Sequence, residues 1–198
     1  MKRFVLLFTI ILLSLLSSQY ASAQGGDWYD KGNYSEGLAW VKDSHWRYGF
    51  VDMTGRLVIP CTWNVAWSFK EGLALVRDDN FKFGFIDKTG KLVIPCKWNT
   101  AFDFSEGLAK VEDHGKFGFI DKTGRLVLPC KWELAGSFHE GLVDVRDDNL
   151  KFGFMDKSGK LVIPCIWEWA FEFENGRAKV LDLNGKEHYI DKTGRVVR

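Results

Sequence analysis

EGLALVRDDNFKFGFIDKTGKLVIPCKWNTAFDFS, residues 71–105, is the unit from which this 198-residue chain is built. Related copies begin at Glu36, Glu106 and Glu140, and a degraded copy begins at Asn175. Successive copies therefore start 35, 35, 34 and 35 residues apart. A fixed period of this size is typical of repeat proteins, whose stacked units share one continuous core.

Each unit contains the pattern of three short strands. The first strand, residues 72–76, alternates apolar positions with a position that varies between copies, as expected for a half-buried strand: Trp40, Leu75, Lys110, Asp144, Lys179. In the second strand, residues 82–87, Gly84 lies between two aromatics, which indicates a bulge or a close backbone approach between repeats. The third strand, residues 91–98, contains Pro95, which has no N–H to donate and indicates an edge or a bulge.

Turn residues recur between the second and third strands. Aspartate opens a type I turn, and a glycine three residues later supplies the positive φ that leads into the next strand. The predicted turn residues are Asp52, Gly55, Asp87, Gly90, Asp121, Gly124, Asp156 and Gly159. Each unit closes with aromatic and small residues at a spacing of three, such as Trp98, Ala101 and Phe104, which favours a tight bend or one helical turn.

These patterns predict an all-β array of about five three-stranded antiparallel units in an open, solenoid-like stack. Because almost five units are present, a closed five-bladed propeller-like ring is the alternative. The last unit is polar, with Glu187 and His188 where other copies have Phe and Gly, as expected of a capped end. The predicted segments are a signal peptide (1–23), an N-terminal cap (24–35) and a repeat domain (36–198) with repeats 36–70, 71–105, 106–139, 140–174 and a partial repeat 175–198.

The first 23 residues have the features of a secretory signal peptide. A basic start, Lys2-Arg3, precedes an apolar run over residues 4–16, and Ala21-Ser22-Ala23 forms an A-x-A cleavage site. We expect cleavage after Ala23 and export to the periplasm or cell surface, with an uncleaved N-terminal anchor as the alternative. No membrane insertion is expected after cleavage, because the other apolar stretches are short.

Charge argues against a nucleic-acid partner. The formal net charge is +1, and Lys2 and Arg3 would leave with the signal peptide, so the mature chain would carry −1. A near-neutral chain lacks the basic surface that binds phosphate backbones.

The four cysteines, Cys61, Cys96, Cys130 and Cys165, occur once per repeat in a Pro-Cys pair. Equivalent positions are one repeat apart, whereas a disulfide needs Cα atoms within about 7 Å. We therefore predict four buried free thiols, with disulfides between neighbouring repeats as the alternative. Zinc is not expected, because structural zinc sites use closely spaced Cys pairs.

The unit resembles the WG-repeat family of bacterial proteins. The residues that carry the resemblance in the second copy are Glu71-Gly72-Leu73-Ala74, Phe83-Gly84-Phe85-Ile86-Asp87, Gly90, Leu92-Val93-Ile94-Pro95, Trp98 and Phe104. Phe or Tyr precedes the glycine where the family often has Trp, so an aromatic is retained. The resemblance implies a binding scaffold that is often exported, and it supplies no catalytic residue.

The sequence contains no convincing catalytic or metal site. The recurring aspartates and glutamates occupy equivalent positions, whereas an acid–base pair needs two different environments. The loops Asp78-Asp79-Asn80 and Asp147-Asp148-Asn149 could offer oxygens to calcium, but each offers few, and turn chemistry explains both. We therefore expect no enzyme activity, no metal and no cofactor.

Tryptophans outside the repeat pattern are the candidate ligand-binding residues. Four fall at positions that are polar or variable in other copies: Trp40, Trp46, Trp67 and Trp169. Exposed aromatics mark binding sites, although the first three could instead cap the first repeat against the N-terminal segment. We expect a non-enzymatic scaffold for an unidentified envelope protein, with a glycan-binding module that uses these tryptophans as the alternative.

Overall fold

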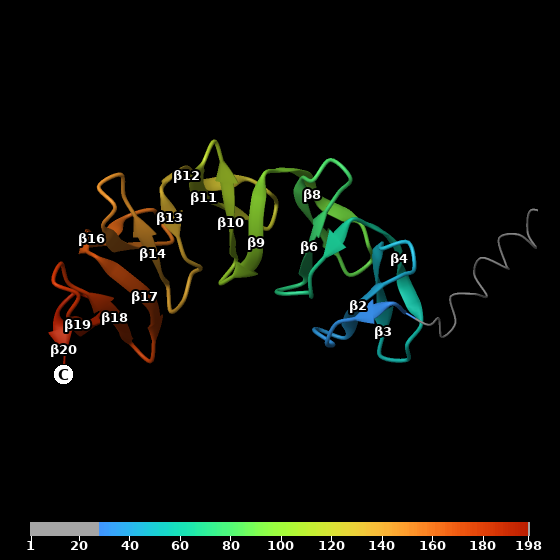
Figure 1. Ribbon diagram of the computed structural model, residues 1–198, viewed down its shortest axis with the longest axis horizontal. Helices are drawn as coiled ribbons and strands as arrows, with labels where there is room; N and C mark the ends of the chain where they lie inside the picture. Colours follow the sequence, from blue (N-terminus) through green and yellow to red (C-terminus); the bar gives the residue numbers. More distant parts are fainter. Residues whose placement is uncertain (1–27, 198) are drawn as a thin grey trace, which may run out of the picture.

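The computed structural model describes residues 28–197, in which all regular secondary structure is β-strand. Five antiparallel sheets of four strands follow one another along the chain and form an open arch (Figure 1). Within the described residues, no helix is long and apolar enough to cross a membrane. The predicted signal peptide and residues 24–27 of the predicted cap lie outside the described part of the chain.

We number the sheets 1 to 5 in chain order. Sheet 1 contains β1 (Asp30–Lys31), β2 (Leu38–Lys42), β3 (Tyr48–Asp52) and β4 (Leu57–Trp63). Sheet 2 contains β5 (Val65–Ala66), β6 (Leu73–Arg77), β7 (Phe83–Asp87) and β8 (Leu92–Trp98). Sheet 3 contains β9 (Thr100–Ser105), β10 (Leu108–Asp113), β11 (Lys116–Asp121) and β12 (Leu126–Trp132). Sheet 4 contains β13 (Leu134–Ala135), β14 (Leu142–Arg146), β15 (Phe152–Asp156) and β16 (Leu161–Trp167). Sheet 5 contains β17 (Trp169–Glu174), β18 (Arg177–Leu181), β19 (Glu187–Asp191) and β20 (Val196–Val197).

The all-β repeat array is confirmed, but each sheet has four strands where three were predicted. The closing segment of one sequence repeat forms the first strand of the next sheet, so the predicted bend or helical turn is wrong. In sheet 3, Ala101 pairs with Val111 and Phe104 pairs with Ala109, so two residues of β9 oppose one of β10 between these pairs. This bulge puts side chains three residues apart on one face, which imitates a helical spacing.

The hydrophobic core lies between sheets. One face of each sheet packs against the first strands of the next, and a buried phenylalanine pair marks each of the four interfaces. The ring centroids are 4.8–5.0 Å apart in Phe50–Phe69, Phe85–Phe104, Phe119–Phe138 and Phe154–Phe173. A single sheet cannot bury its own apolar face, so the stability of each sheet depends on the adjacent sheets that cover it.

The array is open rather than closed. Among the described residues no strand of sheet 5 pairs with sheet 1, and the two ends of the arch lie apart (Figure 1). The last sheet carries Tyr189 where the other sheets have a buried Phe, and this ring is 49% exposed because no sheet covers it. The closed ring, which was the alternative, is therefore not the structure of these residues.

The recurring glycine lies in the third strand of sheets 1 to 4 and makes a close backbone approach inside its own sheet. The predicted bulge is therefore confirmed, and the alternative, an approach between repeats, is wrong. A Cβ built on Gly118 would lie 2.6 Å from the carbonyl oxygen of Leu128 in the adjacent strand. Gly49, Gly84 and Gly153 have the same environment. The register shifts at this point in the pairing of β11 with β12, so the glycine lets a bulged strand cross close to its neighbour.

A repeated glutamate clamp fastens each sheet to the next. Glu106 accepts a hydrogen bond from the backbone N–H of Gly141 at 3.0 Å and pairs with Lys157 Nζ at 2.9 Å. Equivalent clamps use Glu36, Glu71 and Glu140. Sheet 5 has Asn175 at the equivalent position.

Removing one clamp should weaken the array in a pH-dependent way. Burial alone would raise the pKa of Glu106, but the hydrogen bonds from Lys157 and Gly141 lower it below 4.5 overall. We expect Glu106→Ala to lower the free energy of unfolding by about 1 kcal/mol at pH 7, as for a partly exposed charged hydrogen bond. The contribution is present above the unfolded pKa and is lost as the pH falls through the lower folded pKa. Urea unfolding of both proteins at pH 7 and pH 3 measures it; an unchanged difference in acid would contradict the clamp.

Candidate functional site

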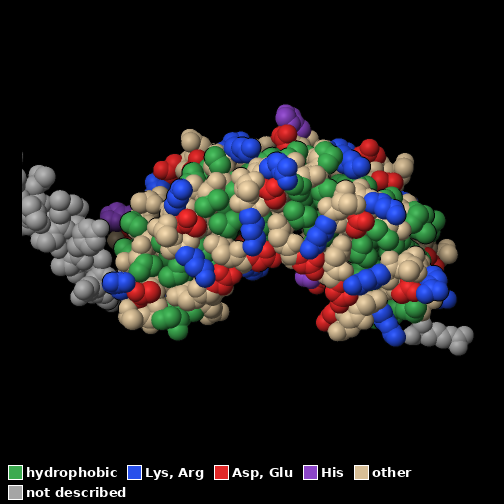
Figure 2. All heavy atoms as spheres, turned by 180° about the vertical axis from the view of Figure 1, so that it is seen from behind, with side chains coloured by type: hydrophobic (Ala, Val, Ile, Leu, Met, Phe, Trp, Pro, Cys, Tyr) green, Lys and Arg blue, Asp and Glu red, His purple; other side chains and the backbone are tan. Residues whose placement is uncertain are grey.

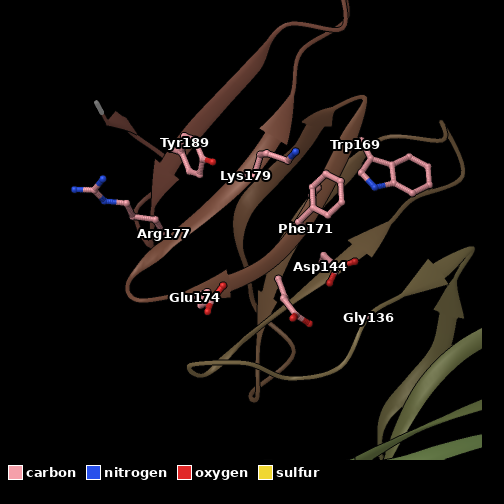
Figure 3. Close-up of a pocket in the computed structure, with 10 residues that line it drawn as sticks. Gly136, Asp144, Trp169, Phe171, Glu174, Arg177, Lys179 and Tyr189 are labelled. Atoms are coloured by element: carbon pink, nitrogen blue, oxygen red, sulfur yellow. The ribbon is translucent and has the colours of Figure 1, made fainter.

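A hollow of about 980 Å³ lies where sheet 4 meets sheet 5 (Figure 3). Sheet 4 contributes Gly136 and Asp144, and sheet 5 contributes the aromatic and charged walls. The side chains that line it include those of Asp144, Trp169, Phe171, Glu172, Lys179 and Tyr189. The first strands of the sheets, such as β9, β13 and β17, lie toward the inner side of the arch (Figure 1), and Figure 2 shows charged side chains of both signs along that hollowed edge.

The hollow lies at sheet 4 because the two residues that face each other there, Gly136 and Asp144, have smaller side chains than the equivalent pairs of the other sheets. In each sheet, one residue in or beside the first strand faces one residue of the second strand. The two residues occupy the position that the hollow occupies in sheet 4. The five facing pairs are Gly32 with Trp40, Trp67 with Leu75, Phe102 with Lys110, Gly136 with Asp144, and Phe171 with Lys179. Direct N–H to carbonyl hydrogen bonds of 3.0 Å join the first, second and fourth pairs. The indole of Trp40 covers Gly32, whereas Gly136 is covered only by a carboxylate.

Asp144 is the most perturbed carboxylate of the described residues. Burial raises its pKa from 3.8 to about 6, and Lys110 only partly offsets this effect. Glu172 raises the pKa further by repulsion, while His139 lowers it. Lys110 points at the backbone instead, because its ammonium group donates a hydrogen bond to the Ala135 carbonyl. The hollow therefore contains a carboxylate with little compensation for its lost hydration.

Neutralising Asp144 should stabilise the protein. The raised pKa means that the folded state binds the proton more tightly than the unfolded state, so stability falls as the pH rises from 3.8 to about 6. A pKa difference of about two units corresponds to about 3 kcal/mol, and burial of the asparagine amide offsets part of it, so we expect Asp144→Asn to raise the free energy of unfolding by about 2 kcal/mol at pH 7.5. The gain should disappear below pH 3.8, where both states are protonated. Urea unfolding at pH 7.5 and pH 3.5 tests this, and a loss of stability at pH 7.5 would contradict it.

Aromatic rings form the walls of the hollow. Trp169 is 46% exposed, and its ring centroid lies 5.0 Å from that of Phe152 in sheet 4. Phe171 lies beneath the ammonium group of Lys179, 4.8 Å from the ring centroid, on the free face of sheet 5. Figure 3 shows Phe171, Lys179 and Tyr189 on this sheet and Asp144 across the hollow. Flat apolar rings beside carboxylates suit a ligand with both an apolar and a polar part.

The four predicted tryptophans do not form one site. Trp40 and Trp46 belong to sheet 1: Trp40 is half-buried against Tyr48, while Trp46 is exposed and lies beneath the ammonium group of Lys42 at 3.7 Å. Trp67 follows β5 of sheet 2, and its ring packs on that of Phe83. Only Trp169 lines the hollow. Asp144 is equivalent to Trp40 in the repeat, but nothing in the local sequence indicated that it lines one hollow with Trp169.

The cysteines are free and half-buried. Burial raises the pKa of Cys61, Cys96 and Cys165 to about 11, and that of Cys130 is also raised. Since the thiolate is the reactive form, we expect these three thiols to react about 100-fold more slowly in the folded protein at pH 8 than in denaturant. Counting thiols with a disulfide reagent should give four in denaturant without reductant. Fewer than four would mean disulfides.

The acidic loops and the cysteines provide no metal site in the structure. Between residues 28 and 197, no group of three or more His, Cys, Asp or Glu side chains converges in a way that could hold an ion. In the loop of sheet 2, Asp78 accepts hydrogen bonds from the backbone N–H groups of Asn80 and Lys82. The turn aspartates act in the same way, as Asp121 does toward Thr123 and Arg125.

Comparisons with solved structures describe the fold. The chain is similar to the computationally designed protein Ika8, with 12% identity and a TM-score of 0.53 over 84% of this chain and 59% of that chain. It is similar to Hsv2 of Kluyveromyces lactis, with 9% identity and a TM-score of 0.51 over 82% of this chain and 59% of that chain. A weaker likeness, with a TM-score of 0.40 and 10% identity, is to the WD40 β-propeller domain of Doa1, over 84% of this chain and 66% of that chain. The chain thus spans less than two thirds of each.

Sequence comparison identifies the repeat. No curated protein matches the chain. The family described as WG containing repeat matches at residues 48–80, 83–117, 117–150 and 152–186, which is more than half of the chain. These matches cover strands of all five sheets, and the repeat β-fold is consistent with a protein-interaction scaffold. The chain belongs to the WG-containing repeat family.

Proposed function

We propose that this protein is an exported, non-enzymatic scaffold that binds a partner protein in the cell envelope, in the periplasm or at the cell surface. One observation carries the proposal: a row of strained, exposed apolar side chains at three equivalent turns, which join β2 to β3, β6 to β7 and β14 to β15. The row consists of Trp46, Phe81 and Leu150, which are 57%, 64% and 56% exposed. Exposed apolar side chains that repeat along a rigid array favour contact with another protein.

Backbone strain supports an external role for the row. Trp46, Phe81 and Leu150 have φ angles of 64°, 60° and 62°, in the left-handed region that bulky residues avoid. In sheet 5 the same turn position holds Gly185, with a φ of 76°, which adopts this conformation without strain. A large apolar residue at this position is unfavourable for folding, because its backbone is held in the left-handed region and its apolar side chain stays in water. Binding to a partner gives a reason for its presence.

The test is capture from envelope extract with matched variants. Replacing Trp46, Phe81 and Leu150 by glycine copies the turn of sheet 5, and we expect the thermal midpoint to stay unchanged or rise. This variant should lose a protein that the purified wild-type protein captures. The control is Leu92→Ser, Leu126→Ser, Leu161→Ser, which removes three exposed leucines from equivalent outer strands. Equal capture by both variants, or reproducible catalytic turnover, would overturn the proposal.

Charge also favours a protein partner over nucleic acid. Lys, Arg, Asp and Glu are interspersed on the face seen in Figure 2, and ion pairs such as Lys116 with Asp148 join neighbouring sheets. A nucleic-acid surface needs a basic field of one sign.

A glycan-binding module is the second candidate. The exposed ring of Trp169 beside carboxylates in the hollow favours it, because a flat ring can stack on a sugar while carboxylates accept its hydroxyl hydrogen bonds. A glycan array with the wild-type protein and Trp169→Ala distinguishes the two candidates. Binding of a glycan that depends on Trp169, without a protein partner, would favour the module.

A further inference from the structure

Among the five facing pairs, that of sheet 4 is the one that contains an acidic residue. In sheets 3 and 5 an aromatic ring of the first strand lies beneath a lysine of the second strand, with Nζ to centroid distances of 4.0 Å in Phe102–Lys110 and 4.8 Å in Phe171–Lys179. In sheet 4 the ring is replaced by Gly136 and the lysine by Asp144. Sheet 5 places Lys179, above the ring of Phe171, and Arg177 in the wall of the hollow, whereas sheet 4 supplies an anion.

The carboxylate of Asp144 lacks an internal partner that matches its charge. Its own backbone N–H donates a hydrogen bond to it, and among residues 28–197 no side-chain hydrogen bond contributes to its pKa. Lys110 is attracted to it, but the ammonium group is bound to the Ala135 carbonyl. Glu172, across the hollow, repels it, although Glu172 itself pairs with His139 at 3.1 Å. A cation placed beside Asp144 would offset this repulsion and restore hydrogen bonds lost on burial.

The walls fit a cation with an apolar stem. Trp169 presents an exposed indole beside the carboxylates, and tryptophan is the strongest aromatic partner for a cation. An arginine side chain can stack its planar guanidinium on such a ring while it donates two hydrogen bonds to one carboxylate. The hollow of about 980 Å³ is large enough for the side chain and its flanking backbone.

We propose that the hollow between sheets 4 and 5 binds a basic side chain of a partner protein, an arginine in preference to a lysine, with Asp144 as the acceptor and Trp169 as the stacking surface. This inference rests on the proposed scaffold function and adds a contact of defined charge to the apolar row of Trp46, Phe81 and Leu150.

The direct test uses a model peptide. N-acetyl-Gly-Gly-Arg-Gly-Gly-amide is titrated into the purified protein, and the indole and Asp side-chain signals are followed by NMR. We expect saturable shifts of Trp169 and Asp144, and binding about tenfold weaker when citrulline, a neutral isostere, replaces arginine. Asp144→Asn should weaken arginine binding by a similar factor. Asp103→Asn, at the position equivalent to Glu172 in sheet 3, should leave it unchanged.

A second variant separates geometry from charge. A Cβ at position 136 would overlap Oδ1 of Asp144, so Gly136→Ala keeps the charge but displaces the carboxylate. We expect it to weaken the peptide as Asp144→Asn does. Equal binding of the arginine and citrulline peptides, or undiminished binding by Asp144→Asn, would overturn the inference, as would saturation by maltotriose with no response to arginine.

The failure of this inference can be told apart from failure of the scaffold function. If the envelope partner is captured equally by wild type and Asp144→Asn, and the peptide does not bind, the scaffold stands and the hollow is not its site. If the peptide binds as expected but no partner depends on the apolar row, the hollow stands and the row does not. Asp144→Asn is expected to fold, since removing the buried charge is stabilising.

Discussion

Replacing Phe119 by alanine is expected to lower the free energy of unfolding by about 4 kcal/mol, because the change leaves a cavity in a closely packed interface. Its ring is 1% exposed and lies 5.0 Å from that of Phe138, edge to face, between sheets 3 and 4. This interface is in the middle of the array, and each sheet depends on its neighbours for burial. The loss therefore weakens the attachment of the C-terminal sheets to the rest.

Phe81→Ala is the matched control for Phe119→Ala. Phe81 is 64% exposed at a turn, so the same truncation should change the free energy of unfolding by less than about 1 kcal/mol. Urea unfolding followed by circular dichroism measures both variants under identical conditions. Equal effects of the two substitutions would mean that the interface phenylalanines do not provide the core.

Gly118→Ala is expected to cost about 3 kcal/mol, at the upper end of the range for overpacking a closed site. The added Cβ would lie 2.6 Å from the Leu128 carbonyl oxygen and 2.7 Å from the backbone nitrogen of Cys130. Both are backbone atoms of β12, so neither can move aside without separating the strands. The backbone of Gly118 is not left-handed, and the whole effect should come from this contact.

Gly115→Ala supplies the comparison in the same sheet. Gly115 has a φ of 78° and open space around it, so alanine there meets only the left-handed backbone, which costs about 1 kcal/mol. Thermal and urea unfolding of the two variants should rank Gly118→Ala as clearly the more damaging. The reverse order would show that the strands can separate at this crossing.

Much of the fold could be predicted from the sequence because it depends on local patterns repeated five times. The alternation around Ala74 and Val76 indicates a half-buried strand, and the Asp87 to Gly90 turn follows from backbone preferences. The fourth strand of each sheet was missed because a bulge gives Ala101 and Phe104 the spacing of a helical turn. That segment is a strand because its backbone forms hydrogen bonds with the next strand across a turn, and the spacing of its apolar residues does not reveal this pairing.

The candidate site could be predicted only in part. Trp169 was identified as an off-pattern aromatic, and it does line the hollow. Asp144 and Gly136 were seen only as variable positions, because their importance arises from what lies across the gap in sheet 5. Of the apolar row, only Trp46 was identified as an off-pattern aromatic, and the strain at Trp46, Phe81 and Leu150 is revealed only by their φ angles.

The sequence by itself determined the period, the strands, the turns and the family, because each follows from residues close together in the chain. Only the tertiary structure decided the offset of sheets from sequence repeats, the open arch, and the meeting of Asp144 with Trp169. These features depend on which faces pack together. In an array of nearly identical units, every interface has the same apolar pattern, so a one-pair exception such as Gly136 and Asp144 becomes a cavity only when the neighbouring sheet is in place.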